Sequence, residues 1–172
     1  MTRPEAGDSD RAAVHVRPAR REDWPRMVEL ERQLARFEKL PEPNDEEAAR
    51  LGEMIFGGGS IEALVAERNG VIEGIAIFWE GLGSSFRARP FLFLEDLVVS
   101  EAARSGRIGE ALMRALAQEG VRRGVVRVEW HVLGWNEDAI RFYRSLGAVA
   151  MDDWTTFRLT GDALGALGVA MS

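Results

Sequence analysis

The sequence of 172 residues lacks cysteine altogether and contains only one tyrosine and one lysine. Without cysteine the chain can form no disulfide bond, no thiolate metal site and no covalent intermediate on a cysteine nucleophile. Tyr143 is the only phenol available for acid chemistry. The two histidines, His15 and His131, are far apart in the sequence and neither lies beside a metal-ligating cluster, so we expect no metal centre.

Long apolar runs are also missing. No segment reaches the roughly 18 consecutive apolar residues of a membrane helix, and residues 1–13 lack the apolar stretch of a secretory signal. We therefore expect a cytoplasmic protein with a disordered segment at 1–13 and a single domain at 14–172. The formal net charge of −6 and the dispersed basic residues argue against a nucleic-acid partner.

Hydrophobic periodicity and turn residues divide the chain into short elements. Strands are predicted at 14–18, 61–67, 71–80, 91–99, 125–132, 148–151 and 155–159. Helices are predicted at 23–39, 44–57, 107–123, 136–146 and 160–167. The second helix has a predicted cap at Asn44, with Glu47 three residues later. Because strands and helices alternate only in the second half, we expect an α+β fold with a mixed sheet and a right-handed parallel crossover over 91–132.

A turn of small residues and arginines follows the predicted strand at 91–99 and opens the next helix. The unpaired N–H groups at a helix start attract anions, and the arginines add positive charge. The turn lacks the Gly-Lys-Ser/Thr ending of a P-loop and the glycine spacing of a dinucleotide fingerprint. It is a candidate anion cradle, with a purely structural turn as the alternative. The cradle residues are Arg104, Ser105, Gly106, Arg107, Ile108 and Gly109.

Two carboxylates, Glu95 and Asp96, interrupt an otherwise apolar strand. Burying a carboxylate costs free energy unless the group is paired or functional. Since adjacent residues of a strand face opposite sides, we expect only one of the two to point into a given cleft. The alternative for Asp96 is a structural role, satisfying backbone donors or an arginine on the other face.

Asn136 and Tyr143 belong to one predicted helix. Asn136 is a candidate N-cap, and Tyr143 lies seven residues later on the same helix face. Tyr143 either anchors this helix to the sheet or serves as an acid, since a phenol has a pKa near 10. Trp154 follows two aspartates and is a candidate contact for a cationic ligand.

These motifs together resemble the GCN5-related N-acetyltransferase (GNAT) superfamily over nearly all of residues 14–160. Within it, the chain is most similar to the diamine (spermidine/spermine) and thialysine acetyltransferase branch. The similarity rests on residues 34–39, 94–99 and 135–148 and on Trp154. The resemblance implies a GNAT-type fold, in which a mixed, mostly antiparallel sheet contains a central splayed pair of parallel strands and is flanked by helices.

The resemblance further implies acetyl-CoA as cosubstrate and a homodimer. Backbone groups of Leu97, Val98 and Val99 would bind the pantetheine arm. Residues 104–109 would bind the pyrophosphate, and Asn136 would orient the arm.

The acceptor implied by the resemblance is a primary amine of a small molecule. Glu95 would act as its base or bind it, with Asp96 and Trp154 also in the acceptor site. A backbone N–H near Val98 would stabilise the oxyanion, and Tyr143 would protonate the leaving thiolate.

Two features depart from the expected pattern of the superfamily and its branch. Arg107 occupies the place of the usual middle glycine in the cradle, which leaves a non-catalytic acyl-CoA-binding module as an alternative. Arg87 and Arg89 would repel a long polycation, so thialysine or another lysine-like amine is favoured over spermidine. A protein or peptide N-acetyltransferase is the remaining alternative.

Overall fold

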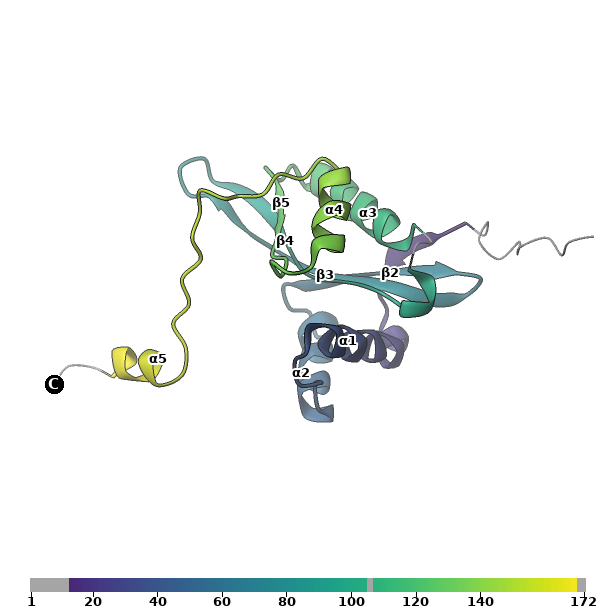
Figure 1. Ribbon diagram of the computed structural model, residues 1–172, viewed down its shortest axis with the longest axis horizontal. Coiled ribbons are helices and arrows are strands. Elements are labelled where there is room, and N and C mark those ends of the chain that lie inside the picture. The colour runs from purple at the N-terminus through teal and green to yellow at the C-terminus, as the bar shows by residue number, and fades with distance from the viewer. Residues whose placement is uncertain (1–12, 105–106, 170–172) are drawn as a thin grey trace, which may run out of the picture. The chain divides into compact units, whose positions relative to one another are not determined.

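A computed structural model describes residues 13–104 and 107–169 (Figure 1). The chain divides into two compact units after His131. The first unit holds the sheet and the helices that cover it, and the second begins at Val132. Most of the expected disordered segment, residues 1–12, lies outside the described part. No helix within the described ranges has both the length and the apolar character needed to span a membrane.

The sheet of the first unit has five strands in the order β1-β2-β3-β4-β5. Strands β1 to β4 pair in antiparallel fashion, whereas β4 and β5 are parallel. This arrangement confirms the predicted α+β fold class with one central parallel pair. The strands are β1 His15–Pro18, β2 Ile61–Arg68, β3 Val71–Ser84, β4 Arg89–Val99 and β5 Val128–Trp130.

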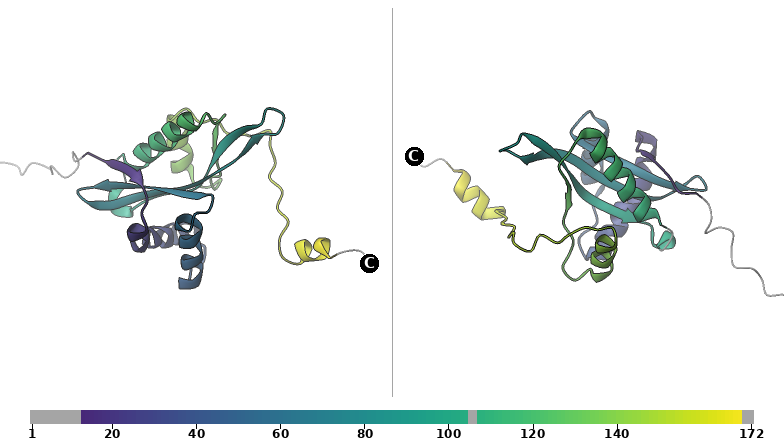
Figure 2. Two further views of the ribbon diagram at one scale, coloured as in Figure 1. Left: turned by 180° about the vertical axis from the view of Figure 1, so that it is seen from behind. Right: turned by 90° about the horizontal axis from the view of Figure 1, so that it is seen from above.

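Helices cover both faces of this sheet (Figures 1 and 2). On one face lie α1 (Trp24–Glu38), which follows the short helix η2 (Arg21–Asp23), and α2 (Asp45–Phe56). On the other face lies α3 (Ile108–Arg123), which follows η3 (Glu101–Ala103). The sheet therefore separates α1 and α2, on one side of β4, from α3 on the other.

Each face has its own apolar packing. Met27 and Leu30 of α1 are fully buried against the sheet, in a cluster that includes Ile77 and Val98. On the opposite face α3 approaches the backbone of β3 closely, because a methyl group added at Gly74 would lie 2.5 Å from Cγ2 of Ile108. The start of α3 is thereby fixed against the middle of the sheet.

The capping box predicted at α2 is confirmed. The Glu47 N–H donates to Oδ1 of Asn44 at 2.9 Å, and the Asn44 N–H donates to Oε2 of Glu47 at 2.9 Å. Helix α1 ends at Lys39, which has a left-handed φ of 59°. The two helices are joined by a short connection, residues 39–44.

The second unit contains α4 (Glu137–Ser145) and α5 (Gly161–Gly168). The strands predicted at 148–151 and 155–159 are wrong, since these residues form no strand. Apolar side chains of this segment are exposed, with Val149 83% and Phe157 92% accessible. Alternating apolar residues make a strand only when a neighbouring edge supplies hydrogen bonds, and the described residues supply none to this segment.

Candidate active site

The predicted anion cradle leads into α3, where Ala111 N–H makes a helical bond to the Arg107 carbonyl at 2.9 Å. The N–H groups of Ile108, Gly109 and Glu110 precede that bond and have no partner within the helix. Arg104 stacks its guanidinium 5.3 Å from the Phe37 ring centroid. The predicted cradle residues Ser105 and Gly106 lie outside the described residues. The described part of the turn has the free N–H groups and positive charge that an anion requires.

Arg107 adopts a left-handed backbone conformation with a φ of 60°. This conformation is strained for any residue with a β-carbon and free for glycine. The superfamily usually has glycine at this position. This chain holds an arginine there in a left-handed conformation that favours glycine, which costs stability.

Arg107→Gly is expected to raise the free energy of unfolding by about 1 kcal/mol, because it removes this strain. Urea denaturation followed by circular dichroism measures the change. Arg107→Ala is the matched control, since it removes the guanidinium but keeps the β-carbon. Equal stabilisation by alanine and glycine would show that the charge, and not the backbone strain, sets the difference.

One edge of β4 is open over its second half. Among the described residues, strand β5 pairs only with Leu92, Phe93 and Leu94, and no strand pairs with β4 on that side from Glu95 to Val99. The parallel pairing of β4 and β5 therefore covers only residues 92–94 of β4.

The direction of the backbone N–H and C=O groups determines which residues of β4 can form hydrogen bonds at this open edge. The Ser100 N–H donates to the Glu73 carbonyl at 2.8 Å, so residues 98 and 100 turn their backbone groups toward β3. Leu97 and Val99 turn theirs toward the open edge. Val98 instead buries its side chain in the α1 face and faces β3 with its backbone. Of the three strand residues predicted to bind pantetheine, Leu97 and Val99 thus offer backbone groups at the edge.

Glu95 is the extra residue of a β-bulge. The register changes from Ile77↔Asp96 to Phe78↔Leu94, which leaves Glu95 without an opposite residue. The Trp79 Nε1–H donates to Oε2 of Glu95 at 3.3 Å, and Trp79 lies on the same sheet face as Ile77. Asp96 also faces this side, toward α1. The bulge interrupts the alternation, so the two carboxylates do not lie on strictly opposite faces, but only Asp96 of the two lines the cavity on this side, as expected of one carboxylate per cleft.

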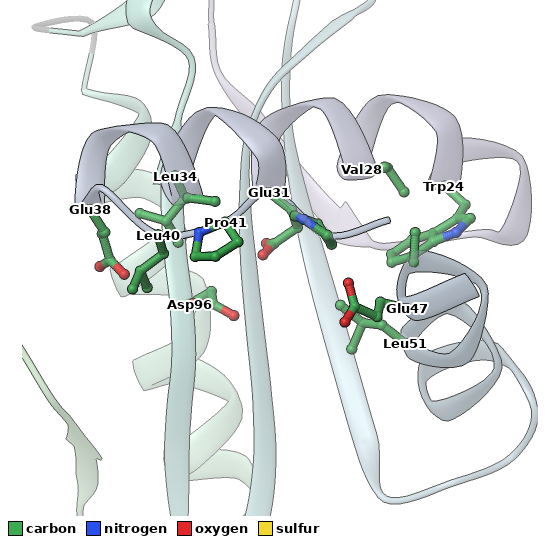
Figure 3. A pocket seen from close by; sticks show the side chains of 13 residues that line it. Trp24, Val28, Glu31, Leu34, Glu38, Leu40, Pro41, Glu47, Leu51 and Asp96 are labelled. Atoms are coloured by element: carbon green, nitrogen blue, oxygen red, sulfur yellow. The ribbon is translucent and has the colours of Figure 1, made fainter. Parts of the chain in front are cut away.

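A cavity of about 260 Å³ lies between α1, α2 and β4 (Figure 3). We call it the acidic pocket, because every charged residue that lines it is an acid. Its walls are otherwise apolar. The acids are Glu31, Glu38, Glu47 and Asp96, and the apolar wall includes Trp24, Leu34 and Leu51.

The carboxyl groups of Glu31 and Asp96 are poorly solvated in this pocket. Burial, with the charges of Asp96 and Glu38 nearby, raises the pKa of Glu31 to about 8. Burial, with the charges of Glu95 and Glu38, raises the pKa of Asp96 to about 6. Oε1 of Glu31 is enclosed and has no hydrogen-bond partner among the described residues. A cation in the pocket would relieve both groups.

Sequence reasoning missed Glu31. The signal was present, because Glu31 follows Met27 by four residues and precedes Leu34 by three, which puts it on the inward face of α1. A carboxylate on the apolar stripe of a helix needs a partner or a function.

The remaining predicted residues belong to the second unit. Asn136 caps α4, since its Oδ1 accepts from the Ala139 N–H at 3.2 Å. Burial raises the pKa of Tyr143 to about 12, so the phenol keeps its proton at neutral pH. Trp154 is 77% exposed. The first unit thus gathers Glu95, Asp96 and the open edge, while the second carries the phenol on a capped helix.

Comparison with known proteins connects these features. The sequence profile of the family described as acetyltransferase (GNAT) matches residues 24–148. Thialysine N-epsilon-acetyltransferase from Mus musculus is 31% identical over 168 residues, covering 89% of this chain and 96% of that protein. L-ornithine N5-acetyltransferase from Arabidopsis thaliana is 40% identical over 97 residues, which are 56% of this chain and 42% of that protein.

Solved structures show the same fold. An integron cassette protein from V. cholerae has a TM-score of 0.79 at 21% identity, covering 95% of this chain and 100% of that one. A probable acetyltransferase has a TM-score of 0.76 at 17% identity, covering 86% of this chain and 98% of that one. With the profile match over most of its length, the chain belongs to the GNAT family of acetyltransferases.

Proposed function

We propose that this enzyme transfers an acetyl group from acetyl-CoA directly to a primary amine of a small molecule. The observation that carries the proposal is the acidic pocket, which lies on the α1 and α2 face of β4 beside the strand's open edge. A cavity of about 260 Å³ suits a small acceptor, and its acids suit a cationic one. The relatives named above act on thialysine and ornithine, which are both amines of this size.

The residues present fit acetyl-CoA, which supplies the acetyl thioester. Backbone groups of Leu97 and Val99 at the open edge would bind the pantetheine arm, with Val98 as their neighbour. The free N–H groups at the start of α3, together with Arg104, would bind the pyrophosphate. Asn136 would orient the arm near the helix that it caps.

Each chemical task falls to a residue with suitable properties. An alkylamine has a pKa near 10.4, so it must lose a proton before it attacks. Glu95 is the proposed acceptor of that proton, directly or through water, and its carboxylate is held by Trp79. An open-edge N–H, from Leu97 or Val99, would stabilise the oxyanion. Tyr143 would donate its proton to the sulfur as the C–S bond breaks and the amide C–N bond forms.

A homodimer, which the resemblance implies, and a cytoplasmic location complete the proposal. The proposed acceptors are small molecules with a primary amine, namely thialysine, lysine-like amino acids and di- or polyamines.

A thiol-release assay with acetyl-CoA tests the proposal. We expect release that depends on an added amine, measured over thialysine, lysine, ornithine, diamines, polyamines and short peptides. A reaction without amine is the control for hydrolysis. Turnover of peptides alone would favour the peptide acetyltransferase, and tight binding of CoA without turnover would favour the non-catalytic module.

A further inference from the structure

We propose that Glu31, acting with Asp96, recognises a second ammonium group on the acceptor and so selects a diamine without a carboxylate. The inference rests on the proposed function and concerns the end of the acceptor that does not react. Glu31 is then a specificity-determining residue of the acetyl transfer.

The position of Glu31 carries the first step. Its side chain descends from α1 into the acidic pocket and points to the space that Asp96 enters from β4 (Figure 3). The two carboxyl groups interact electrostatically, although they come from residues 65 positions apart in the sequence. Asp96 adjoins the bulge residue Glu95, the proposed base. The acidic pocket therefore reaches from Glu31 to Asp96, one residue from the proposed base.

The lack of a protein partner carries the second step. A buried carboxylate kept for structure is normally bound by an arginine or by backbone N–H groups, as Asp23 is by Arg17 and by the Arg20 N–H in this chain. Among the described residues, Oε1 of Glu31 has no such donor. A bound ammonium would supply the missing hydrogen bonds and the opposite charge.

The rest of the lining selects between kinds of cation. Trp24, Leu34 and Leu51 give the pocket apolar walls that suit a methylene chain. The described lining includes no arginine, lysine or histidine to pair with a carboxylate. An amino acid would bring its carboxylate into this lining, where the described residues offer it no cation and burial of an unpaired charge is costly.

Three amines of one chain length separate these contributions. 1,5-Diaminopentane has both amines, lysine adds a carboxylate to it, and pentylamine lacks the second amine. For the unaltered enzyme we expect kcat/KM to be about 10-fold or more higher for 1,5-diaminopentane than for either of the others.

The variant Glu31→Gln tests the contribution of this one carboxylate. We expect it to lower kcat/KM for 1,5-diaminopentane about 10-fold, mainly through KM, and to change the value for pentylamine by less than about 2-fold. The control is Glu29→Gln, on the same helix but outside the pocket and 62% exposed, which should change neither.

The possible outcomes distinguish a failure of this inference from a failure of the proposed function. Equal losses for the diamine and the monoamine in Glu31→Gln would overturn the inference, because Glu31 would then act on the fold or on the chemistry. Lysine used as well as 1,5-diaminopentane would also overturn it, with the proposed function intact. If the unaltered enzyme acetylates no amine, the proposed function and this inference both fail.

Discussion

Tyr143→Phe is expected to lower kcat about 100-fold or more, with little change in the affinity for acetyl-CoA. General acids typically contribute 10²- to 10⁴-fold. The substitution removes one oxygen and keeps the ring, so packing on α4 is preserved. Steady-state kinetics with the best amine of the panel measures kcat, and calorimetric titration with CoA measures binding.

The chain offers no second phenol, which makes this test decisive. Burial raises the pKa of Tyr143 to about 12, so the phenol keeps its proton across the usual assay range and its ionisation should produce no loss of activity below about pH 10. Thermal unfolding of the variant controls for damage to α4. An unchanged kcat would assign thiolate protonation to another donor, such as water.

Glu31→Gln is expected to stabilise the protein, by roughly 2 kcal/mol at pH 8.5, and to have almost no effect near pH 4. Burial raises the pKa of Glu31 from 4.5 to about 8 in the folded chain. Below pH 4.5 both the folded and the unfolded chain hold the proton. Between pH 4.5 and about 8 only the folded chain holds the Glu31 proton, so the free energy of unfolding of the unaltered protein falls as the pH rises. Glutamine does not titrate and escapes this loss.

Urea unfolding at several pH values measures the effect, with Glu29→Gln as the exposed control. Asp96 remains in the variant, and its raised pKa leaves a smaller fall in stability between about pH 4 and 6. A stability difference that does not grow between pH 5 and pH 8 would contradict the assigned burial of Glu31. A stability difference that does grow over this range, together with the kinetic test, would show that Glu31 costs stability and contributes to specificity.

Local signals in the sequence predicted the parts of the fold that depend on near neighbours. The Asn44 cap, the helix carrying Tyr143 and the strand around Glu95 each depend on residues within a turn or two, and each is found. The segment at 148–159 shows the limit, because a strand needs a partner that its own residues do not reveal.

The candidate site was harder to predict than the fold for a similar reason. Strand alternation placed Glu95 and Asp96 on opposite faces, and no residue type in β4 announces the bulge, which depends on pairing with β3. Glu31 was hidden among the buried apolar residues of α1, such as Met27 and Leu30. Its importance follows only from what surrounds it, namely Asp96 from a distant strand and the loop after α1.

The single extra residue in β4 also links the two substrates of the reaction. Before the bulge, even-numbered residues turn their backbone groups toward β5, as the Leu92 N–H bond to Arg127 shows. After it, the odd-numbered Leu97 and Val99 do so. Deleting Glu95 would therefore remove the proposed base and, in the same step, exchange the backbone groups that are proposed to bind the thioester arm. Under the proposed roles, donor and acceptor alignment both depend on this one inserted residue, so neither can be changed along this strand without the other.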